Sequence, residues 1–261
     1  MAIQPKRCFS QNFLRDARVA ERIVAAAGLR EGERVFEIGP GLGVLTRRLL
    51  PLCQELQAVE IDPELAARLE ALGASNLVVH QGDALRLSWP ELLSHPPYIL
   101  VANLPYHISS PIFFKILEER HLFRRLVLMF QREFGARLCA FPGTKDYGIP
   151  SVFCRQYFDA EVVFEVAPQA FSPIPKVASA VLALTPLAAP RVAVGEERFF
   201  ARVVRASFAQ RRKTLFNSLR GAGFDLPHLA DRIHAAGIDP QRRGETLDLD
   251  EFAKLSRALE G

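Results

Sequence analysis

The chain reads Glu37-Ile-Gly-Pro-Gly-Leu-Gly-Val-Leu-Thr46 where a short apolar run gives way to a stretch of helical period. Glycines at positions 39, 41 and 43 let a ligand come close to the backbone, where a side chain would collide with it. A dinucleotide-binding turn needs the spacing G-x-G-x-x-G, but Val44 or Thr46 occupies the place of its third glycine. The stretch therefore predicts a strand, a tight ligand-binding turn and a helix, and it disfavours a nicotinamide-linked oxidoreductase.

Short apolar, β-branched runs alternate with helical segments on both sides of this turn, up to about residue 185. Such alternation is typical of a parallel sheet covered by helices. The predicted strands span residues 34–38, 57–61, 77–80, 98–102, 126–130, 160–166 and 179–184. Because ligands of open α/β sheets bind at the carboxyl ends of the strands, we expect the functional side chains at those ends.

Two carboxylates stand at successive strand ends. Val59-Glu-Ile-Asp62 places Glu60 where it can accept hydrogen bonds from the two hydroxyls of a ribose. Gly82-Asp-Ala84 places Asp83 and a neighbouring backbone amide where they can bind the amino group and a ring nitrogen of adenine. A single acid at such a place is more often a helix cap or a solvated loop residue. Together with the glycine turn, however, the two acids predict an adenosine ligand without a pyrophosphate.

Asn103-Leu-Pro-Tyr106 follows the fourth predicted strand. The Asn103 side-chain carbonyl and the main-chain carbonyl of Leu104 or Pro105 are two acceptors for the hydrogens of an exocyclic amino group. Tyr106 offers a face on which a base can stack. Two such acceptors favour the pyramidal form of an aromatic amine, whose lone pair is then free to attack an electrophile, and no strong general base is needed. The simpler alternative is an Asn cap followed by a proline turn.

Two further segments are candidates for the walls of this site. Phe171-Ser-Pro-Ile-Pro-Lys-Val177 is a loop stiffened by prolines, and its Phe171 ring forms either a wall of a base pocket or part of the core. Gln11-Asn-Phe-Leu14 precedes a helix that Asp16 caps, and it is either a lid over the ligand or an ordinary loop.

The composition changes at Thr185-Pro-Leu-Ala-Ala-Pro190, which we interpret as a linker. We therefore expect one domain over residues 1–186 and a small helical domain over residues 187–261. Seven basic residues and no acidic ones stand between Arg198 and Arg220, interleaved with apolar residues at helical spacing. A charge run is usually a solvated helix face. Without acids, however, this run lacks i,i+4 ion pairs, which favours RNA phosphates as its partner.

The overall composition excludes several classes of protein. With 261 residues, 49% hydrophobic and 24% charged, the chain can bury a sizeable core and is not disordered. No apolar run approaches the ~20 residues of a membrane span, and the start lacks the apolar stretch of a signal peptide. The four cysteines form no C-x-x-C pair and no zinc spacing with histidine, so we expect buried thiols and no metal site. These features predict a soluble cytoplasmic protein, which we expect to be a monomer.

Taken together and in this order, the motifs at residues 11–14, 37–46, 59–62, 82–84, 103–106 and 171–177 resemble those of the KsgA (RsmA) family of small-subunit rRNA adenine dimethyltransferases. Pro142-Gly-Thr-Lys-Asp-Tyr-Gly148 and Gln210-Arg-Arg-Lys-Thr-Leu215 also look like family features. The resemblance implies an α/β fold, with a Rossmann-like sheet domain of the class I methyltransferases and a small all-α C-terminal domain. It implies S-adenosyl-L-methionine as the cofactor and S-adenosyl-L-homocysteine as its product.

The resemblance also implies roles for individual residues. Those expected to contact the cofactor are Gln11, Asn12, Leu14, Gly39, Gly41, Glu60, Ile61, Asp83, Ala84 and Asn103. Those expected to hold the target adenine are Asn103, Leu104, Pro105, Tyr106 and Phe171. The basic residues expected to bind RNA are Arg198, Arg202, Arg205, Arg211, Arg212 and Lys213. Ser10 and His107 depart from the glycine and asparagine common in the family, and neither departure removes an assigned catalytic group.

The reaction that the resemblance implies is N6,N6-dimethylation of two adjacent adenosines in the 3′-terminal hairpin of 16S rRNA, within a small-subunit precursor late in assembly. Because a stacked adenine cannot reach a strand-end pocket, the base must be flipped out or presented in a loop. One alternative is a methyltransferase of the Erm type for 23S rRNA, against which the Gly-Pro-Gly-Leu-Gly turn and the Phe-x-Pro-x-Pro-Lys-Val loop argue. The other is an assembly or transcription factor with little catalysis, which the intact Asn-Leu-Pro-Tyr and Glu60 disfavour.

Overall fold

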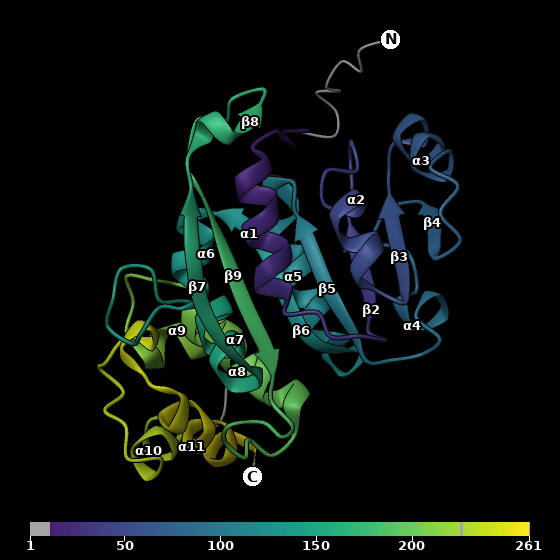
Figure 1. Ribbon diagram of the computed structural model, residues 1–261. Helices are drawn as coiled ribbons and strands as arrows, with labels where there is room; N and C mark the ends of the chain where they lie inside the picture. Colours follow the sequence, from purple (N-terminus) through teal and green to yellow (C-terminus); the bar gives the residue numbers. More distant parts are fainter. Residues whose placement is uncertain (1–10, 225–226, 261) are drawn as a thin grey trace. The chain divides into compact units, whose positions relative to one another are not determined.

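A computed structural model describes residues 11–224 and 227–260 (Figure 1). Cys8 and Ser10 therefore lie outside the described residues. The chain forms two compact units. The first contains the described chain up to Gly135 together with Asp159–Pro186, and the second contains Ala136–Phe158 together with the chain from Leu187 onward. The domain boundary expected after residue 186 coincides with a point where the chain passes from the first unit into the second. Residues 136–158, which were expected in the first domain, belong to the second unit together with the C-terminal helices.

The first unit is built on a seven-stranded sheet with the order β4-β3-β2-β5-β6-β9-β7 (Figure 1). Its strands are β2 (Arg34–Ile38), β3 (Glu55–Glu60), β4 (Leu77–Gln81), β5 (Tyr98–Asn103), β6 (Phe123–Gln131), β7 (Phe158–Val166) and β9 (Ser179–Pro186). The pairs β2–β3, β2–β5, β3–β4 and β5–β6 are parallel, and β9 runs antiparallel to β6. The predicted α/β fold with a mostly parallel sheet is confirmed. The strand order reverses beside β2, and such a switch point is where these sheets bind ligands.

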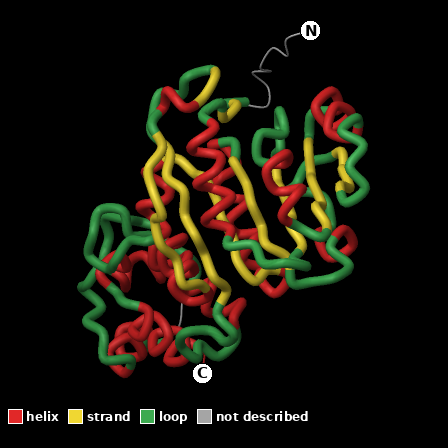
Figure 2. Tube along the Cα trace, in the orientation of Figure 1, coloured by secondary structure: helices red, strands yellow, loops and turns green. Residues whose placement is uncertain are grey.

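Helices flank this sheet (Figure 2). They are α1 (Ala17–Ala27), α2 (Thr46–Leu49), α3 (Pro63–Glu70), α4 (Trp89–Leu92), α5 (Ser109–Glu118) and α6 (Arg132–Leu138), with 3₁₀ turns η2 (Leu50–Leu52), η3 (Tyr106–Ile108), η4 (Arg120–Leu122) and η5 (Pro168–Ala170). The predicted cap of α1 is present, because the Asp16 carboxylate accepts hydrogen bonds from the amides of Arg18 and Val19. The helix ends at Gly28, whose φ of 57° suits glycine.

Buried aliphatic side chains from α1 and the central strands form the core of the first unit. Ile23, Val35 and Val101 are at most 1% exposed. Phe36 follows Val35 on the same strand and so points to the opposite face, where its ring packs edge-on against Trp89 at 5.3 Å. Both faces of the central strands are therefore covered, which explains why their sequences are apolar without alternation.

The second unit is helical, as expected for the C-terminal region. Its helices are α7 (Ile149–Tyr157), α8 (Glu197–Phe208), α9 (Leu215–Gly221), α10 (Leu229–Ala235) and α11 (Leu249–Glu260), with a 3₁₀ turn η6 (Gly244–Thr246). The Phe153 ring of α7 packs edge-on against Phe200 of α8 at 6.0 Å, and Phe208 stacks on Phe252 of α11 at 5.9 Å. These ring contacts explain why residues 136–158 fold with the C-terminal helices.

Within residues 11–224 and 227–260, no helix is long and apolar enough to span a membrane. The same residues contain no group of three or more His, Cys, Asp or Glu side chains placed to hold a metal ion. Cys53 and Cys154 are buried, Cys139 is half-buried, and all three are free thiols.

Candidate active site

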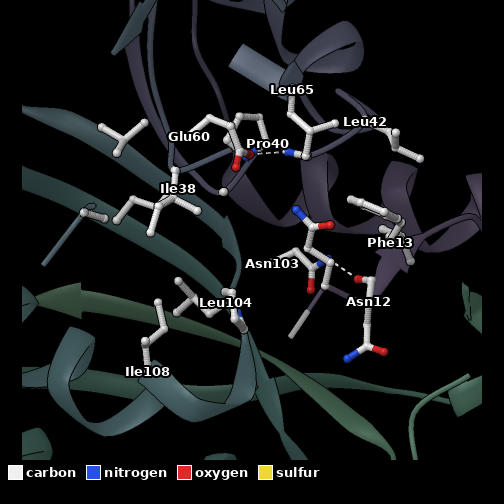
Figure 3. A pocket seen from close by; sticks show the side chains of 18 of the residues that line it. Asn12, Phe13, Ile38, Pro40, Leu42, Glu60, Leu65, Asn103, Leu104 and Ile108 are labelled. Carbon is white, nitrogen blue, oxygen red and sulfur yellow. Dashed lines mark hydrogen bonds between the residues drawn. The ribbon is translucent and has the colours of Figure 1, made fainter. Parts of the chain in front are cut away.

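The carboxyl ends of β2, β3 and β5 and the loop after β4 surround a cavity of about 290 Å³ in the first unit (Figure 3). Its lining includes every residue expected to contact the cofactor or the target adenine, namely Gln11, Asn12, Leu14, Gly39, Gly41, Glu60, Ile61, Asp83, Ala84, Asn103, Leu104, Pro105, Tyr106 and Phe171. Segments far apart in the sequence thus meet at one edge of the sheet. The individual roles of these residues stay predictions.

At three positions, Gly39, Gly41 and Gly43, the turn after β2 has a backbone conformation that only glycine adopts readily. Gly39 has φ of 68° and Gly41 has φ of 58°. A Cβ atom on Gly41 would also lie 3.2 Å from Cδ1 of Phe13, which belongs to the N-terminal segment. Gly41 therefore allows this segment to lie close over the turn.

Glu60 ends β3 and is only 4% exposed. Its Oε2 accepts a hydrogen bond from the Gly41 amide at 2.9 Å (Figure 3). Its Oε1 accepts one from the Asp62 amide at 3.0 Å. Burial raises the pKa of this carboxyl, while the two amides act in the opposite direction. Since each carboxylate oxygen can accept a second hydrogen bond, the fixed Glu60 can bind a diol, as predicted for the ribose.

The loop after β4 carries Asp83 and Ala84. The Asp83 Oδ1 accepts a hydrogen bond from the Leu85 amide at 2.9 Å, so this carboxylate also organises its own turn. Arg86 approaches the other oxygen at 3.6 Å. Asp83 thus combines the local loop role that an isolated acid usually has with a place in the cavity wall.

Two residues that the sequence analysis missed hold this loop. The Lys115 ammonium, from α5, donates to the carbonyls of Leu85 and Leu87, and the Trp89 Nε1 donates to the carbonyl of Ala84 at 3.0 Å. Burial lowers the pKa of Lys115. No spacing rule indicates these contacts, because Lys115 lies about thirty residues away and acts on main-chain carbonyls rather than on a motif residue.

The N-terminal segment and the Phe171 loop form one ribbon. Strand β1 (Phe13–Leu14) pairs antiparallel with β8 (Phe171–Ser172), and the Arg15 amide donates to the Ala170 carbonyl at 2.8 Å. Phe171 is 3% exposed, belongs to the core cluster and also lines the cavity. The two alternatives that the sequence left open for Phe171 are therefore compatible with each other.

Asn103 ends β5, and Tyr106 begins the 3₁₀ turn η3 that follows. The Asn103 Nδ2 lies 3.5 Å from the Asn12 carbonyl, which leaves the Oδ1 of the same amide as an acceptor (Figure 3). The Pro105 carbonyl accepts a hydrogen bond from the Ile108 amide at 3.2 Å, whereas the Leu104 carbonyl accepts none within residues 11–224 and 227–260. Of the two main-chain acceptors considered from the sequence, Leu104 is therefore the better candidate.

Glu37 lies on β2 beneath the glycine turn and is 1% exposed. Burial raises the pKa of Glu37 to about 8, and the negative charge of Glu60 adds to this effect. Among the described residues, neither of the Glu37 carboxylate oxygens has a hydrogen bond of good geometry, although the hydroxyl and the amide of Thr46 act to lower its pKa. From the sequence, Glu37 was expected only to begin the motif of the glycine turn, with no role of its own.

The predicted RNA-binding residues lie in the second unit, and one of them forms an ion pair with an acid from outside the basic run. Arg211 Nε pairs with Glu245 Oε2 at 3.0 Å, an acid that lies 34 positions further along the chain. Arg202 lies over the Phe224 ring at 4.5 Å. Arg212 and Lys213, by contrast, are exposed and form no ion pair within the described part of the chain.

A family model described as "Ribosomal RNA adenine dimethylase" matches residues 3–260. The chain belongs to this family. It is 58% identical to a ribosomal RNA small subunit methyltransferase A from Syntrophotalea carbinolica, over 98% of this chain and 97% of that one. It is 47% identical to the protein of the same name from Geobacter metallireducens, over 98% and 96%. These matches confirm the resemblance inferred from the motifs.

Two solved structures have similar folds. A dimethyladenosine transferase from Plasmodium falciparum superposes with a TM-score of 0.79 at 28% identity, covering 93% of this chain and 95% of that one. The 23S rRNA methyltransferase ErmE superposes with a TM-score of 0.68 at 28% identity, covering 96% of this chain and all of the other. The family fold therefore extends over both units.

Proposed function

We propose that this protein is an rRNA adenine dimethyltransferase that uses S-adenosyl-L-methionine to methylate N6 of two adjacent adenosines in the 3′-terminal hairpin of 16S rRNA. It acts as a monomer in the cytoplasm, on a small-subunit precursor late in assembly. The observation that carries this proposal is the single cavity in which the glycine turn, Glu60, Asp83 and the Asn103–Tyr106 segment meet.

The cavity fits the cofactor. Glu60 has a fixed carboxylate for the ribose, the Asp83–Ala84 loop offers a carboxylate and an amide for the adenine, and the turn at Gly39–Gly41 leaves backbone space for the amino-acid part. Gln11, Asn12 and Leu14 cover the same cavity from the N-terminal side. When bound, the cofactor supplies an electrophilic methyl group.

The chain's own residues then act on the target amine. The Asn103 Oδ1 and the Leu104 carbonyl accept its two hydrogens and favour its pyramidal form, which frees the lone pair. Tyr106 and Phe171 hold the base between them by stacking, an interaction worth about 1 to 3 kcal/mol for an unstacked base. Because the nitrogen loses its proton only after it has been alkylated, an amide oxygen suffices and no carboxylate or histidine has to serve as a base.

The RNA itself requires phosphate contacts outside the cavity. Exposed cations on the second unit, Arg198, Arg212 and Lys213 among them, are suited to that role, and Arg202, Arg205 and Arg211 lie on the same helix or the turn that follows it. Phosphate contacts of this kind position a substrate, while the cavity selects the base.

Two other functions are less well supported. The similarity to ErmE suggests 23S rRNA as an alternative substrate. The relatives at 58% and 47% identity, however, are named as small-subunit methyltransferases. A factor without catalysis would not need to keep Glu60 hydrogen-bonded at the cavity or Asn103 with a free Oδ1.

The test is to offer purified small and large ribosomal subunits from cells without this modification to the protein, each with tritiated cofactor. We expect label in the small subunit only. Label in the large subunit would support the Erm type, and no label in either would support a factor without catalysis.

A further inference from the structure

A large aromatic side chain stands open to solvent in the second unit. Phe141, in the loop between α6 and α7, is 61% exposed. Burying such a ring against a partner would be favourable, because it removes apolar surface from water. Single exposed apolar residues are nevertheless common, so a partner is inferred only where the surroundings of the residue point to one. Two features of the surroundings of Phe141 point to a binding partner: the loop that carries it is anchored, and its neighbours are cationic.

The loop holds Phe141 in a fixed place. The Phe141 carbonyl accepts hydrogen bonds from the Thr144 hydroxyl at 2.7 Å and from the Thr144 amide at 3.2 Å. The Gly143 amide donates to the Glu245 carbonyl at 2.8 Å, and the buried Tyr147 hydroxyl donates to the Leu247 carbonyl at 2.9 Å. The ring is therefore presented by an anchored turn, so that little conformational entropy would be lost when it binds a partner.

A guanidinium group is already stacked on the ring. The Arg155 Cζ lies 4.5 Å from the centroid of the Phe141 ring. Such a pair offers both an apolar face and a cation, the combination with which proteins hold an unpaired base and its neighbouring phosphate. A purely apolar protein partner would have to desolvate this guanidinium, which makes that kind of partner a poor fit.

The same loop is tied to the predicted RNA-binding turn. The Arg211 guanidinium donates to the Lys145 carbonyl at 2.6 Å, and so joins the Phe141 loop to the turn that carries Arg212 and Lys213. The side chains of Lys145, Arg212 and Lys213 are exposed. Glu245 is already paired with Arg211, and Asp146, the acid of the loop itself, is one negative charge among the four cations Lys145, Arg155, Arg212 and Lys213. The charge around Phe141 is therefore complementary to a polyanion.

We propose that Phe141, backed by Arg155, is a stacking platform for an unpaired base of the rRNA, with Lys145 and the Arg212–Lys213 turn contacting the phosphates on either side. The proposal rests on the proposed function in that it takes the rRNA as the partner. It adds an aromatic binding point in the second unit, distinct from the catalytic cavity of the first.

The test measures binding of the full chain, without cofactor, to small subunits that lack the modification. Phe141→Ala should weaken binding about 5- to 150-fold, the equivalent of ~1 to 3 kcal/mol for one stacked base. Phe141→Trp should bind at least as tightly as the unchanged protein, whereas Phe141→Leu should bind almost as weakly as the alanine variant. Val163→Ala, which truncates an exposed apolar residue of the first unit, is the matched control and should bind normally.

Salt dependence separates stacking from charge. Phe141→Ala should leave the slope of log K against log salt unchanged, while Lys145→Ala should reduce it by about 0.7, the value for one phosphate of a single strand. Equal binding by the unchanged protein and by Phe141→Leu would overturn the stacking platform. So would a Phe141→Ala effect confined to self-association in sedimentation, which would identify a second copy of the chain as the partner.

The binding assay also keeps this proposal separate from the proposed function. If the unchanged protein binds the subunit with the expected Phe141 dependence but transfers no methyl group, the proposed function fails and the platform stands. If methyl transfer is normal and Phe141→Ala binds and reacts like the unchanged protein, only the platform fails.

Discussion

The hydroxyl groups of Tyr106 and Ser179 lie 2.9 Å apart. Ser179 begins β9, is fully buried, and pairs with Gln131 of β6 in the sheet. A rigid strand thus holds the tip of the ring that we expect to stack on the target base. We therefore expect Ser179 to act as a positioning residue, and it was not among the residues expected from the sequence.

Loss of this contact should weaken the hold on the base without affecting the cofactor. We expect Ser179→Ala to lower kcat/KM for the RNA about 2- to 10-fold, the range for one hydrogen bond of ~0.5 to 1.5 kcal/mol, with cofactor affinity unchanged. Tyr106→Phe removes the same bond and should give a similar loss. The double variant should be no worse than either single one, and additive losses would contradict the assigned role.

Asn103 should matter for transfer far more than for cofactor binding. We expect Asn103→Ala to lower kcat at least 100-fold, because an acceptor for the target amine is lost where the transition state needs it. The cofactor Kd, measured by calorimetry, should change only a few-fold, since Glu60 and Asp83 remain. A kcat within a few-fold of the unchanged enzyme would show that the amine is activated by another group.

Gly41 and Gly28 form a matched pair for testing the glycine turn. Both have φ near 57°, but a Cβ on Gly28 has no heavy atom within 4 Å, whereas on Gly41 it meets the Phe13 ring at 3.2 Å. Both alanine variants should lose ~1 to 2 kcal/mol of stability in denaturant titrations. Only Gly41→Ala should also weaken cofactor binding, because its methyl group displaces the segment over the cavity. Equal cofactor affinities would contradict this.

Lys115 should affect the cofactor through the loop that it holds. Lys115→Met removes the donor to the carbonyls of Leu85 and Leu87 and should weaken cofactor binding several-fold. Lys254→Met, on the exposed side of α11, is the control and should leave binding unchanged. A loss of stability in Lys115→Met without any change in cofactor Kd would limit this lysine to a folding role.

Glu37 should make stability fall as the pH rises. Its pKa is about 8 in the folded protein and near 4.5 when unfolded, so between these values the folded state holds the extra proton. By linkage, the free energy of unfolding decreases across this pH window, by up to a few kcal/mol, and levels off above about pH 8. Glu37→Gln should lack this decrease, so its stability relative to the unchanged protein should grow from pH 5 to pH 8. A constant difference over that range would refute the raised pKa.

The sequence predicted those parts of the site that depend on local motifs. The glycine turn, Glu60, Asp83 and Asn103 each follow a strand, and the parallel sheet brings strand ends together, so their meeting could be expected. Ser179 and Lys115 could not, because each acts across the tertiary fold on a residue 73 positions away or on main-chain carbonyls. The ion pair between Arg211 and Glu245 was missed for the same reason, since only near neighbours along a helix were considered.

The most direct test of the central claim is mass analysis of the 3′-terminal fragment of small-subunit rRNA after reaction with the unchanged protein and with Asn103→Ala. The account predicts two adjacent N6,N6-dimethyladenosines with the unchanged protein and unmodified adenosines with the variant. An unmodified fragment with the unchanged protein, or full dimethylation by Asn103→Ala, would contradict it.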